Sequence, residues 1–325
     1  MTRLLLVEVR RFFARDIVRL FGLILIGGIV LTSIGSFLSS LPMAPEEAAD
    51  ADQRIRFNRT GMEEQIRFCR NPPPRQIEIR EEPGMPPEFV ERMRMEAERD
   101  RTRRECLDQL RPSGDGRLVF AGTYPVNIQL AIFPMALMSL AIGATLMGAE
   151  WISGTVTTQL TWEPRRLRLF AAKALIGAIG VLAAFVALQA LMALSLLPGT
   201  LMRGTFAGID RWWWEHFLDI SWRGGVVLAI ACLLGFGVSG LIRNTVAAVG
   251  GLFAYLLIVE NILRAVTQDL QEWLITNNLL VAVLPDGSRI IPGRSAEQAL
   301  LLLCAYVFGI LVISGFLFWR RDVAG

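Results

Sequence analysis

Apolar residues occur in long charge-free runs along most of the chain. Six runs contain no Asp, Glu, Lys or Arg, and they cover residues 20–45, 118–149, 174–202, 224–242, 244–259 and 299–319. A helix needs about 20 apolar residues to cross the core of a bilayer, and five of the runs are long enough. The remaining run, 244–259, is shorter, but Glu260 and Arg264 lie one turn apart at its end and can pair at the membrane interface. The pattern therefore predicts six membrane-spanning helices.

This pattern indicates an all-α polytopic membrane protein with six transmembrane helices. The predicted spanning helices are residues 20–41, 123–148, 173–198, 224–242, 244–263 and 298–319. Four segments connect the spans. Residues 42–122 form an extracytoplasmic helical insert, and residues 149–172 form a cytoplasmic segment. Residues 199–223 form an extracytoplasmic Trp-rich interfacial segment, and residues 264–297 form an extracytoplasmic or re-entrant segment. Residues 320–325 form a short cytoplasmic tail.

Residues 1–19 have the pattern of an amphipathic helix. At about 100° per residue one polar stripe forms, and it consists of Glu8, Arg11, Arg15 and Arg19. The opposite side is apolar and consists of Leu6, Val9, Phe13, Ile17 and Leu20. Such a helix lies on the cytoplasmic membrane surface, apolar face down, before the chain enters the first span. The alternative is the ordinary basic flank of a signal anchor.

Basic residues in the short loops orient the predicted spans. They precede the first span, follow the sixth, and occur between the second and third spans and between the fourth and fifth. Short cytoplasmic loops carry an excess of Lys and Arg, so both termini are expected to be cytoplasmic. The chain has a single Lys beside 32 Arg, which by codon usage favours a GC-rich bacterial genome. We therefore expect a multi-pass protein of a bacterial plasma membrane.

One region departs from the apolar pattern, because residues 42–117 carry 32 of the 63 acidic and basic residues. Long loops translocate largely regardless of charge, so this region is expected outside the cytoplasm. Cys69 and Cys106 both lie in it, and an even pair of cysteines in an oxidising compartment favours a disulfide. Prolines separate two helical patterns here, so we predict an extracytoplasmic helical hairpin, inserted between helices 1 and 2 and stapled near its end. The alternative is a disordered charged loop with two free thiols.

Composition narrows the classes of function. The chain is 53% apolar and 19% charged, whereas globular domains carry about 25% charge. This excludes a simple soluble enzyme and disfavours nucleic-acid binding, despite the net charge of +3. Lys173 lies between two alanines, so the chain has no G-x-x-x-x-G-K-[ST] motif for ATP. His216 is the only histidine, and two thiols alone do not make a zinc site, so we predict neither a catalytic nor a metal site.

The cytoplasmic segment 149–172 mixes acid, glycine, threonine and base. Thr155 to Gln159 has mixed helix preference, and Pro164 is suited to the first turn of a new helix. A short helix presented to the cytosol, with charges at either end, would suit docking to a soluble partner. A solvated connector whose arginines only set the topology explains the pattern equally well.

The residues of this segment resemble a known family. The pattern Glu150-x-x-x-Gly154-Thr155, followed by Leu160, Pro164, Arg166 and Lys173, is similar to the segment after the second span of ABC-2 type ABC transporter permeases. The tight turn Gly-Leu-Ile-Arg at 240–243, the N-terminal surface helix and the six spans are similar as well. The family's first outer loop is usually much shorter, so the charged insert departs from the family pattern.

The resemblance implies the transmembrane permease subunit of an ABC exporter. Such permeases pair as dimers, with a second copy or a related permease, and bind separate ATP-binding subunits that hold ATP and Mg. The resemblance thus implies no cofactor in this chain. It also implies that segment 149–172 couples to the ATP-binding subunit through Glu150, Gly154, Thr155, Thr158, Glu163, Pro164, Arg165 and Arg166. The expected charges at membrane ends of helices are Lys173, Arg243 and Glu260.

The predicted spans are apolar apart from isolated polar residues, namely Asn127, Gln129 and Gln189. A transport pathway lined in this way suits a hydrophobic or amphipathic cargo better than an ion. We also expect membrane lipid to contact the outer surfaces of the spans. The alternative function is a non-transport receptor or scaffold subunit, whose extracytoplasmic hairpin binds a partner outside the cell.

Overall fold

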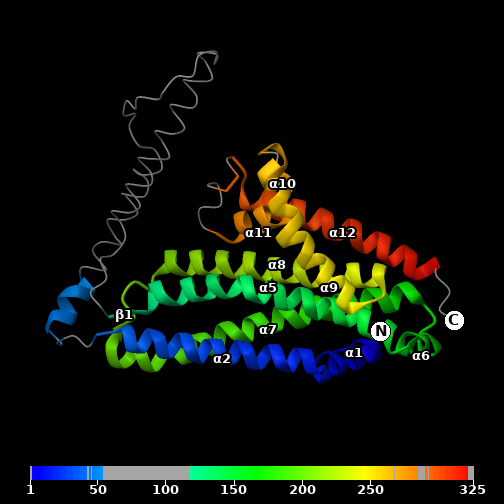
Figure 1. The fold of residues 1–325 in the computed structure, drawn as a ribbon. Helices are drawn as coiled ribbons and strands as arrows, with labels where there is room; N and C mark the ends of the chain where they lie inside the picture. The colour runs from blue at the N-terminus through cyan, green and yellow to red at the C-terminus, as the bar shows by residue number, and fades with distance from the viewer. Residues whose placement is uncertain are drawn as a thin grey trace, which may run out of the picture. The chain divides into compact units, whose positions relative to one another are not determined.

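The computed structural model describes residues 2–41, 44, 46–53, 117–266, 268–284, 290–291 and 293–320, which are predominantly helical (Figure 1). Six helical stretches among them are long and apolar enough to cross a membrane: α2 (Asp16–Ser39), α5 (Phe120–Ile152), α7 (Arg166–Arg203), α8 (Arg211–Ile242), Thr245–Val266 and α12 (Ala296–Arg320). These six stretches confirm the prediction of a helical, multi-pass membrane protein. Cys69, Cys106 and the predicted hairpin around them lie outside the described residues.

The chain divides into two compact units. The larger, called the helical unit below, comprises residues 1–35, 122–197 and 211–325. The smaller, called the insert unit, comprises residues 36–121 and 198–210. Within the helical unit α2, α5, α7 and α8 run side by side, and α12 packs against α8 (Figure 1).

Glycines bring α5 and α8 into backbone contact. A Cβ added at Gly143 of α5 would overlap the carbonyl group of Cys232 in α8. One added at Gly235 of α8 would overlap the carbonyl oxygen of Leu140 in α5. Small residues at such crossings give helices close van der Waals packing, which is the main attraction between helices surrounded by lipid. The two glycines thus determine how closely α5 and α8 approach.

The fifth spanning stretch is interrupted by a π-helix. It consists of α9 (Thr245–Ala254), the π-helix η1 (Tyr255–Val259) and α10 (Glu260–Val266). A 3₁₀-helix, η2 (Gln268–Trp273), and α11 (Ile275–Val283) follow in the segment predicted to be extracytoplasmic or re-entrant. Helix α11 packs against both α8 and α12, so this segment belongs to the helical unit.

Glu260 is fully buried and caps the start of α11. Its carboxylate accepts hydrogen bonds from the backbone N–H groups of Ile275 and Thr276, at 2.8 and 2.9 Å. The first N–H groups of a helix have no partner within the helix, so the carboxylate compensates for both. The expected pairing of Glu260 with Arg264 is therefore wrong. Arg264 instead donates to the side-chain oxygen of Asn277 at 2.9 Å.

In the insert unit an ion pair joins the two ends of the charged insert. Residues 46–53 are helical, and the carboxylate of Asp52 lies 2.8 Å from the guanidinium group of Arg117. The hydroxyl group of Thr205 also donates to Asp52, at 3.0 Å. Next to it, β1 (Leu118–Val119) pairs in parallel with β2 (Gly204–Thr205). These contacts clamp the chain on both sides of residues 54–116.

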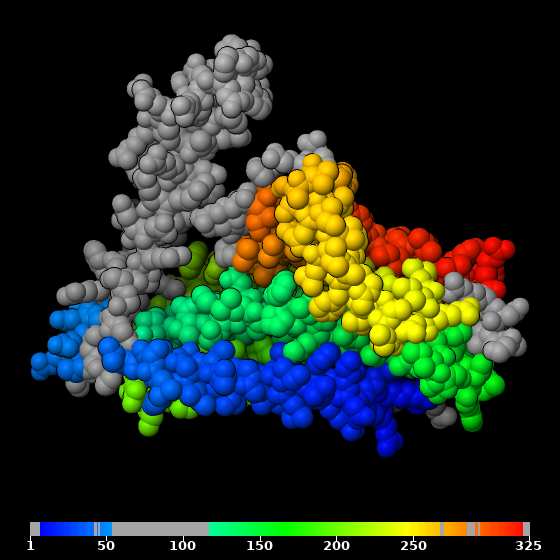
Figure 2. All heavy atoms as spheres, in the orientation of Figure 1, coloured from blue at the N-terminus to red at the C-terminus, as the bar shows by residue number. Residues whose placement is uncertain are grey.

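The spanning helices present apolar side chains to their surroundings. Helix α2 faces the viewer along its length in Figure 2, and its residues Leu23 and Leu31 are 68% and 76% exposed. Val246 of α9 and Phe308 of α12 are likewise largely exposed. Soluble monomers rarely expose contiguous apolar faces of this extent, whereas lipid-facing helices require them.

We predict that Gly235→Ala destabilises the helical unit, whereas Gly250→Ala does not. The new Cβ at 235 would overlap the carbonyl group of Leu140, so α5 and α8 must separate; an added Cβ at Gly250 meets nothing within 4 Å. Overpacking of this kind costs about 1–3 kcal/mol. The midpoint of thermal unfolding of both purified variants in detergent checks this. Equal midpoints would mean that the two helices do not cross at Gly235.

Candidate functional site

A short helix, α6 (Thr155–Trp162), connects α5 to α7. Gly154 precedes it with φ of 69°, a left-handed backbone conformation that glycine adopts without strain. Val156 and Gln159 are its buried residues, three positions apart and therefore on one face. Trp162 at its end is 87% exposed. One face of α6 thus packs on the protein while the other is open.

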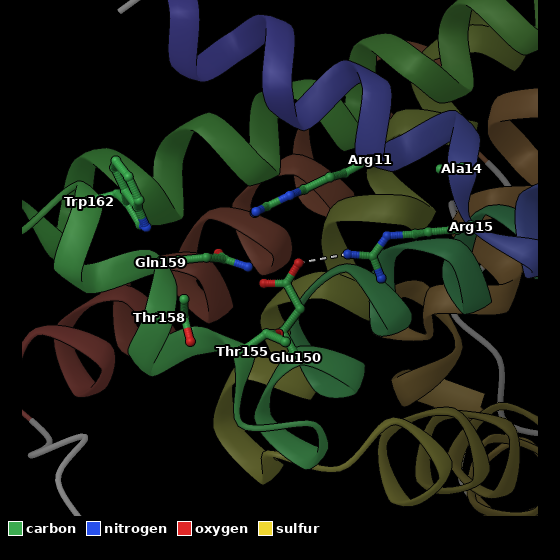
Figure 3. A pocket seen from close by; sticks show the side chains of 8 residues that line it. All are labelled: Arg11, Ala14, Arg15, Glu150, Thr155, Thr158, Gln159 and Trp162. Carbon is green, nitrogen blue, oxygen red and sulfur yellow. Dashed lines mark hydrogen bonds and ion pairs between the residues drawn. The ribbon is translucent and has the colours of Figure 1, made fainter.

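The single Lys of the chain is buried between two carboxylates. Lys173 of α7 is 2% exposed, and its Nζ lies 2.7 Å from Oε2 of Glu150 in α5. The same Nζ lies 3.1 Å from Oε2 of Glu8 in α1 (Thr2–Ala14). Arg15 donates to Glu150 at 2.8 Å and to the backbone carbonyl of Thr145 at 2.7 Å (Figure 3). Glu8, Arg15, Glu150 and Lys173 are called the charge cluster below.

Because the charge cluster is buried, it is stable only when all of its ions are paired. Each ion loses several kcal/mol of hydration, and only close partners of opposite charge offset the loss. Phe12 adds an apolar contact next to the cluster: it is 2% exposed, and a Cβ added at Gly180 of α7 would lie 2.6 Å from its ring. The ion pairs and this ring contact together attach α1 to α5 and α7.

Several helix ends meet around α6 and the charge cluster (Figure 1). Arg166 at the start of α7 donates to the backbone carbonyl of Trp319, near the end of α12, at 3.3 Å. Arg243 follows α8 with φ of 60°, and its guanidinium group lies 4.5 Å from the ring centroid of Trp151 in α5. The Trp151 ring also contacts Phe318 of α12 edge-on, at 6.0 Å. The ends of α5, α8 and α12 therefore lie together with the start of α7.

The residues expected to contact an ATP-binding subunit differ in their exposure. Glu150 is buried and pairs with Lys173, the expected membrane-end charge, inside the charge cluster. Glu163 and Arg166 are partly exposed. The exposed members of the set are Gly154, Thr155, Thr158, Pro164 and Arg165.

The sequence pattern did not indicate that Glu8 and Arg15 belong to this site. It assigns them to a polar stripe facing water, but Glu8 is 3% exposed and its carboxylate pairs with Lys173 of α7. One signal was present: Glu8 is the only acid in an otherwise basic helix, and Lys173 is the only Lys of the chain. Two such isolated opposite charges are natural partners, but their distance in sequence hides the pairing.

A cavity of about 400 Å³ opens between α1 and α6 (Figure 3). Its lining residues are Arg11, Ala14, Arg15, Glu150, Thr155, Thr158, Gln159 and Trp162. Within the part of the chain that the structure describes, no group of three or more His, Cys, Asp or Glu is arranged to hold a metal ion. The cavity offers two guanidinium groups and the carboxylate of Glu150, beside hydroxyl and amide groups.

We predict that Lys173→Met destabilises the protein by about 3–5 kcal/mol, because Glu150 keeps only Arg15 as a close cation and the buried Glu8 keeps only the half-exposed Arg11, at 3.3 Å. Adding Glu8→Gln to Lys173→Met should recover much of the loss, because Arg15 and Glu150 then form a balanced pair. Arg168→Met on the same helix is the matched control. Thermal unfolding in detergent measures all four proteins. A double variant no more stable than Lys173→Met would contradict the proposed coupling.

Comparison with known proteins adds no assignment to these observations. No protein family model matches the chain, and no curated protein matches its sequence. The residues and contacts of the chain itself are therefore the basis for a function. They describe a helical, multi-pass membrane protein in which a short connecting helix is attached at a buried charge cluster.

Proposed function

We propose that this chain is the transmembrane permease subunit of an ATP-driven ABC exporter of the ABC-2 type, powered by a separate ATP-binding subunit. The observation that carries the proposal is α6: a short helix between two spanning helices, with an open face and a base fastened to three helices. A receptor that only anchors an outer module has no need for such a mechanical link.

The contacts of α6 are suited to passing on a displacement. Glu150 lies just before α6 at the end of α5, and it pairs with Lys173 of α7 and with Arg15 after α1. Because buried ion pairs tolerate little separation, a push on α6 would move these helices together rather than bend the connection. Rigid-body shifts of this kind underlie many switching transitions.

The open face of α6 supports docking to a soluble subunit. Trp162 is 87% exposed, and Thr157, Thr158 and Thr161 are exposed on the turns before it. An exposed Trp is among the side chains that most often dominate the binding energy of an interface. In this proposal the ends of α1, α6 and α12 are cytoplasmic, and the membrane is a bacterial plasma membrane.

The remaining parts of the proposal concern partners and cargo. ATP and Mg bind to the partner subunit, and the permease works as a dimer with a second copy or a related permease. The proposed cargo is hydrophobic or amphipathic. Of the polar residues in the spans, Gln129 is engaged within the protein, because its Nε2 donates to the carbonyl of Val283 at 2.9 Å. Asn127 keeps a buried Nδ2 without a hydrogen-bond partner and is the better choice for a cargo contact.

A receptor or scaffold function is the second candidate, and the clamp at the base of the insert favours it. The Asp52–Arg117 ion pair of 2.8 Å, with Arg117 only 4% exposed, holds both ends of a large outer segment together. Such a base suits a module that binds a partner outside the cell, either in place of transport or alongside it.

We predict that Trp162→Ala lowers recovery of the co-expressed ABC ATP-binding subunit of this proposal about tenfold in co-purification. The reason is that the open face of α6 loses its largest exposed side chain. Trp222→Ala on α8, where the side chain is 67% exposed, is the matched control and should leave recovery unchanged. Gly154→Pro, which alters the left-handed turn before α6, should act like Trp162→Ala. Normal recovery and ATPase activity in both α6 variants would reject α6 as the docking element.

A further inference from the structure

The cavity between α1 and α6 has more positive than negative charge around it. Together with the charge cluster it brings three cations, Arg11, Arg15 and Lys173, to two carboxylates, Glu8 and Glu150. Among the described residues this leaves one positive charge without a counterpart. Glu150 is already shared by Lys173 and Arg15, and Glu8 by Lys173 and Arg11, so the excess falls on the two arginines that line the cavity.

Two buried polar atoms at the same place have neither a hydrogen-bond partner nor an ion-pair partner, whereas the buried Oε2 of Glu150 is paired with Lys173. They are Nε of Arg15 and Oε1 of Gln159. Gln159 is only 8% exposed, and its side chain extends from α6 toward Glu150 and Arg15 (Figure 3). Buried polar groups are nearly always satisfied in native proteins, so groups left open at the wall of a cavity point to a ligand. A 180° rotation of the amide group exchanges the positions of its oxygen and nitrogen, so that the N–H₂ group, a donor, can face an anion.

We propose that this cavity binds the phosphate group of an anionic ligand. Arg11 and Arg15 would supply charge-assisted N–H donors, and Gln159 and Thr158 would supply neutral donors. Guanidinium forks match the oxygens of a phosphate group in both geometry and charge, and one phosphate anion balances the excess charge. At about 400 Å³ the cavity holds more than a phosphate ion, so a headgroup or a small phosphate ester fits as well.

The surroundings of the cavity suit two sources of this phosphate. Val9 and Phe13 are exposed on α1, the helix that carries Arg11, and the spanning helices carry apolar outer faces, as a lipid headgroup would require. Basic pockets at the ends of spanning helices bind anionic lipid headgroups in this way. A free phosphate ester would use the same arginines. Either ligand would bridge α1 and α6 and thereby change how firmly α6 is held.

The test uses the purified full chain in neutral detergent, without any ATP-binding subunit, so that it does not depend on the proposed function. Phosphatidylglycerol, phosphatidylcholine, glycerol 3-phosphate and inorganic phosphate are titrated, and the thermal unfolding midpoint gives an apparent affinity. We expect a rise of the midpoint with phosphatidylglycerol or with a soluble phosphate, and none with phosphatidylcholine. If the soluble phosphates act, the source is a free ester; if only phosphatidylglycerol acts, the source is lipid.

Variants then locate the site. Arg11→Gln and Gln159→Glu should each weaken the apparent affinity about tenfold or more, since the first removes a donor and the second places a negative charge in the cavity. Arg10→Gln removes the same charge from an exposed position of α1 outside the cavity, and should bind like the unaltered chain. The proposal is overturned if no phosphate compound shifts the midpoint of the unaltered chain. It is equally overturned if Arg10→Gln weakens binding as much as Arg11→Gln.

Discussion

The buried position of Lys173 is the constraint on which the other contacts at this end of the helical unit depend. An ammonium group 2% exposed must be neutralised, and the two carboxylates that do so come from α1 and α5. The N-terminal helix α1 is thereby fixed against α5 and α7, although more than 100 residues separate it from them in sequence. Arg15 and Phe12 complete the attachment, the first through Glu150 and the second through its seat on Gly180. Burial of apolar surface alone would allow α1 to slide, because the hydrophobic effect is not directional.

Helix α6 derives its properties from this attachment. It begins a few residues after Glu150, and α7 carries Lys173 two turns beyond its own start, so both connections of α6 end in the charge cluster. A short helix held in this way can be displaced only together with α1, α5 and α7. The cavity beside it follows from the same arrangement, because Arg11 and Arg15 extend from α1 toward a helix whose buried face offers an amide group. Docking on the open face of α6, and anion binding in the cavity that Thr158 and Trp162 of that face also line, would therefore act on one element.

Elsewhere in the helical unit, buried contacts also fix the positions of helices, but through different chemistry. Glu260 is as deeply buried as Lys173, but its partners are the first N–H groups of α11, so a helix start takes the place of a cation. Helices α5 and α8 approach through Gly143 and Gly235 instead of through charges. Each of these contacts is specific to one geometry, whereas the apolar outer faces of α2 and α12 are not. The contacts inside the helical unit thus determine how the helices are arranged. The apolar outer faces determine only that the surroundings are lipid and not water.

The six apolar spans follow from the sequence alone, because the length of an apolar run is a property of neighbouring positions. For the segment between α5 and α7 the sequence left a short helix and a solvated connector equally open, and the structure shows the helix. The sequence also singled out Glu150 and Lys173, through the pattern of one segment. Only the tertiary structure decided what neutralises them: Glu8 lies 165 positions before Lys173, and no local periodicity relates the two. The cap that Glu260 forms on α11 was misjudged for the same reason, since Arg264 one turn away was the nearest partner in sequence but not in space. Burial and partnership are properties of the packed helices, and a single chain pattern does not contain them.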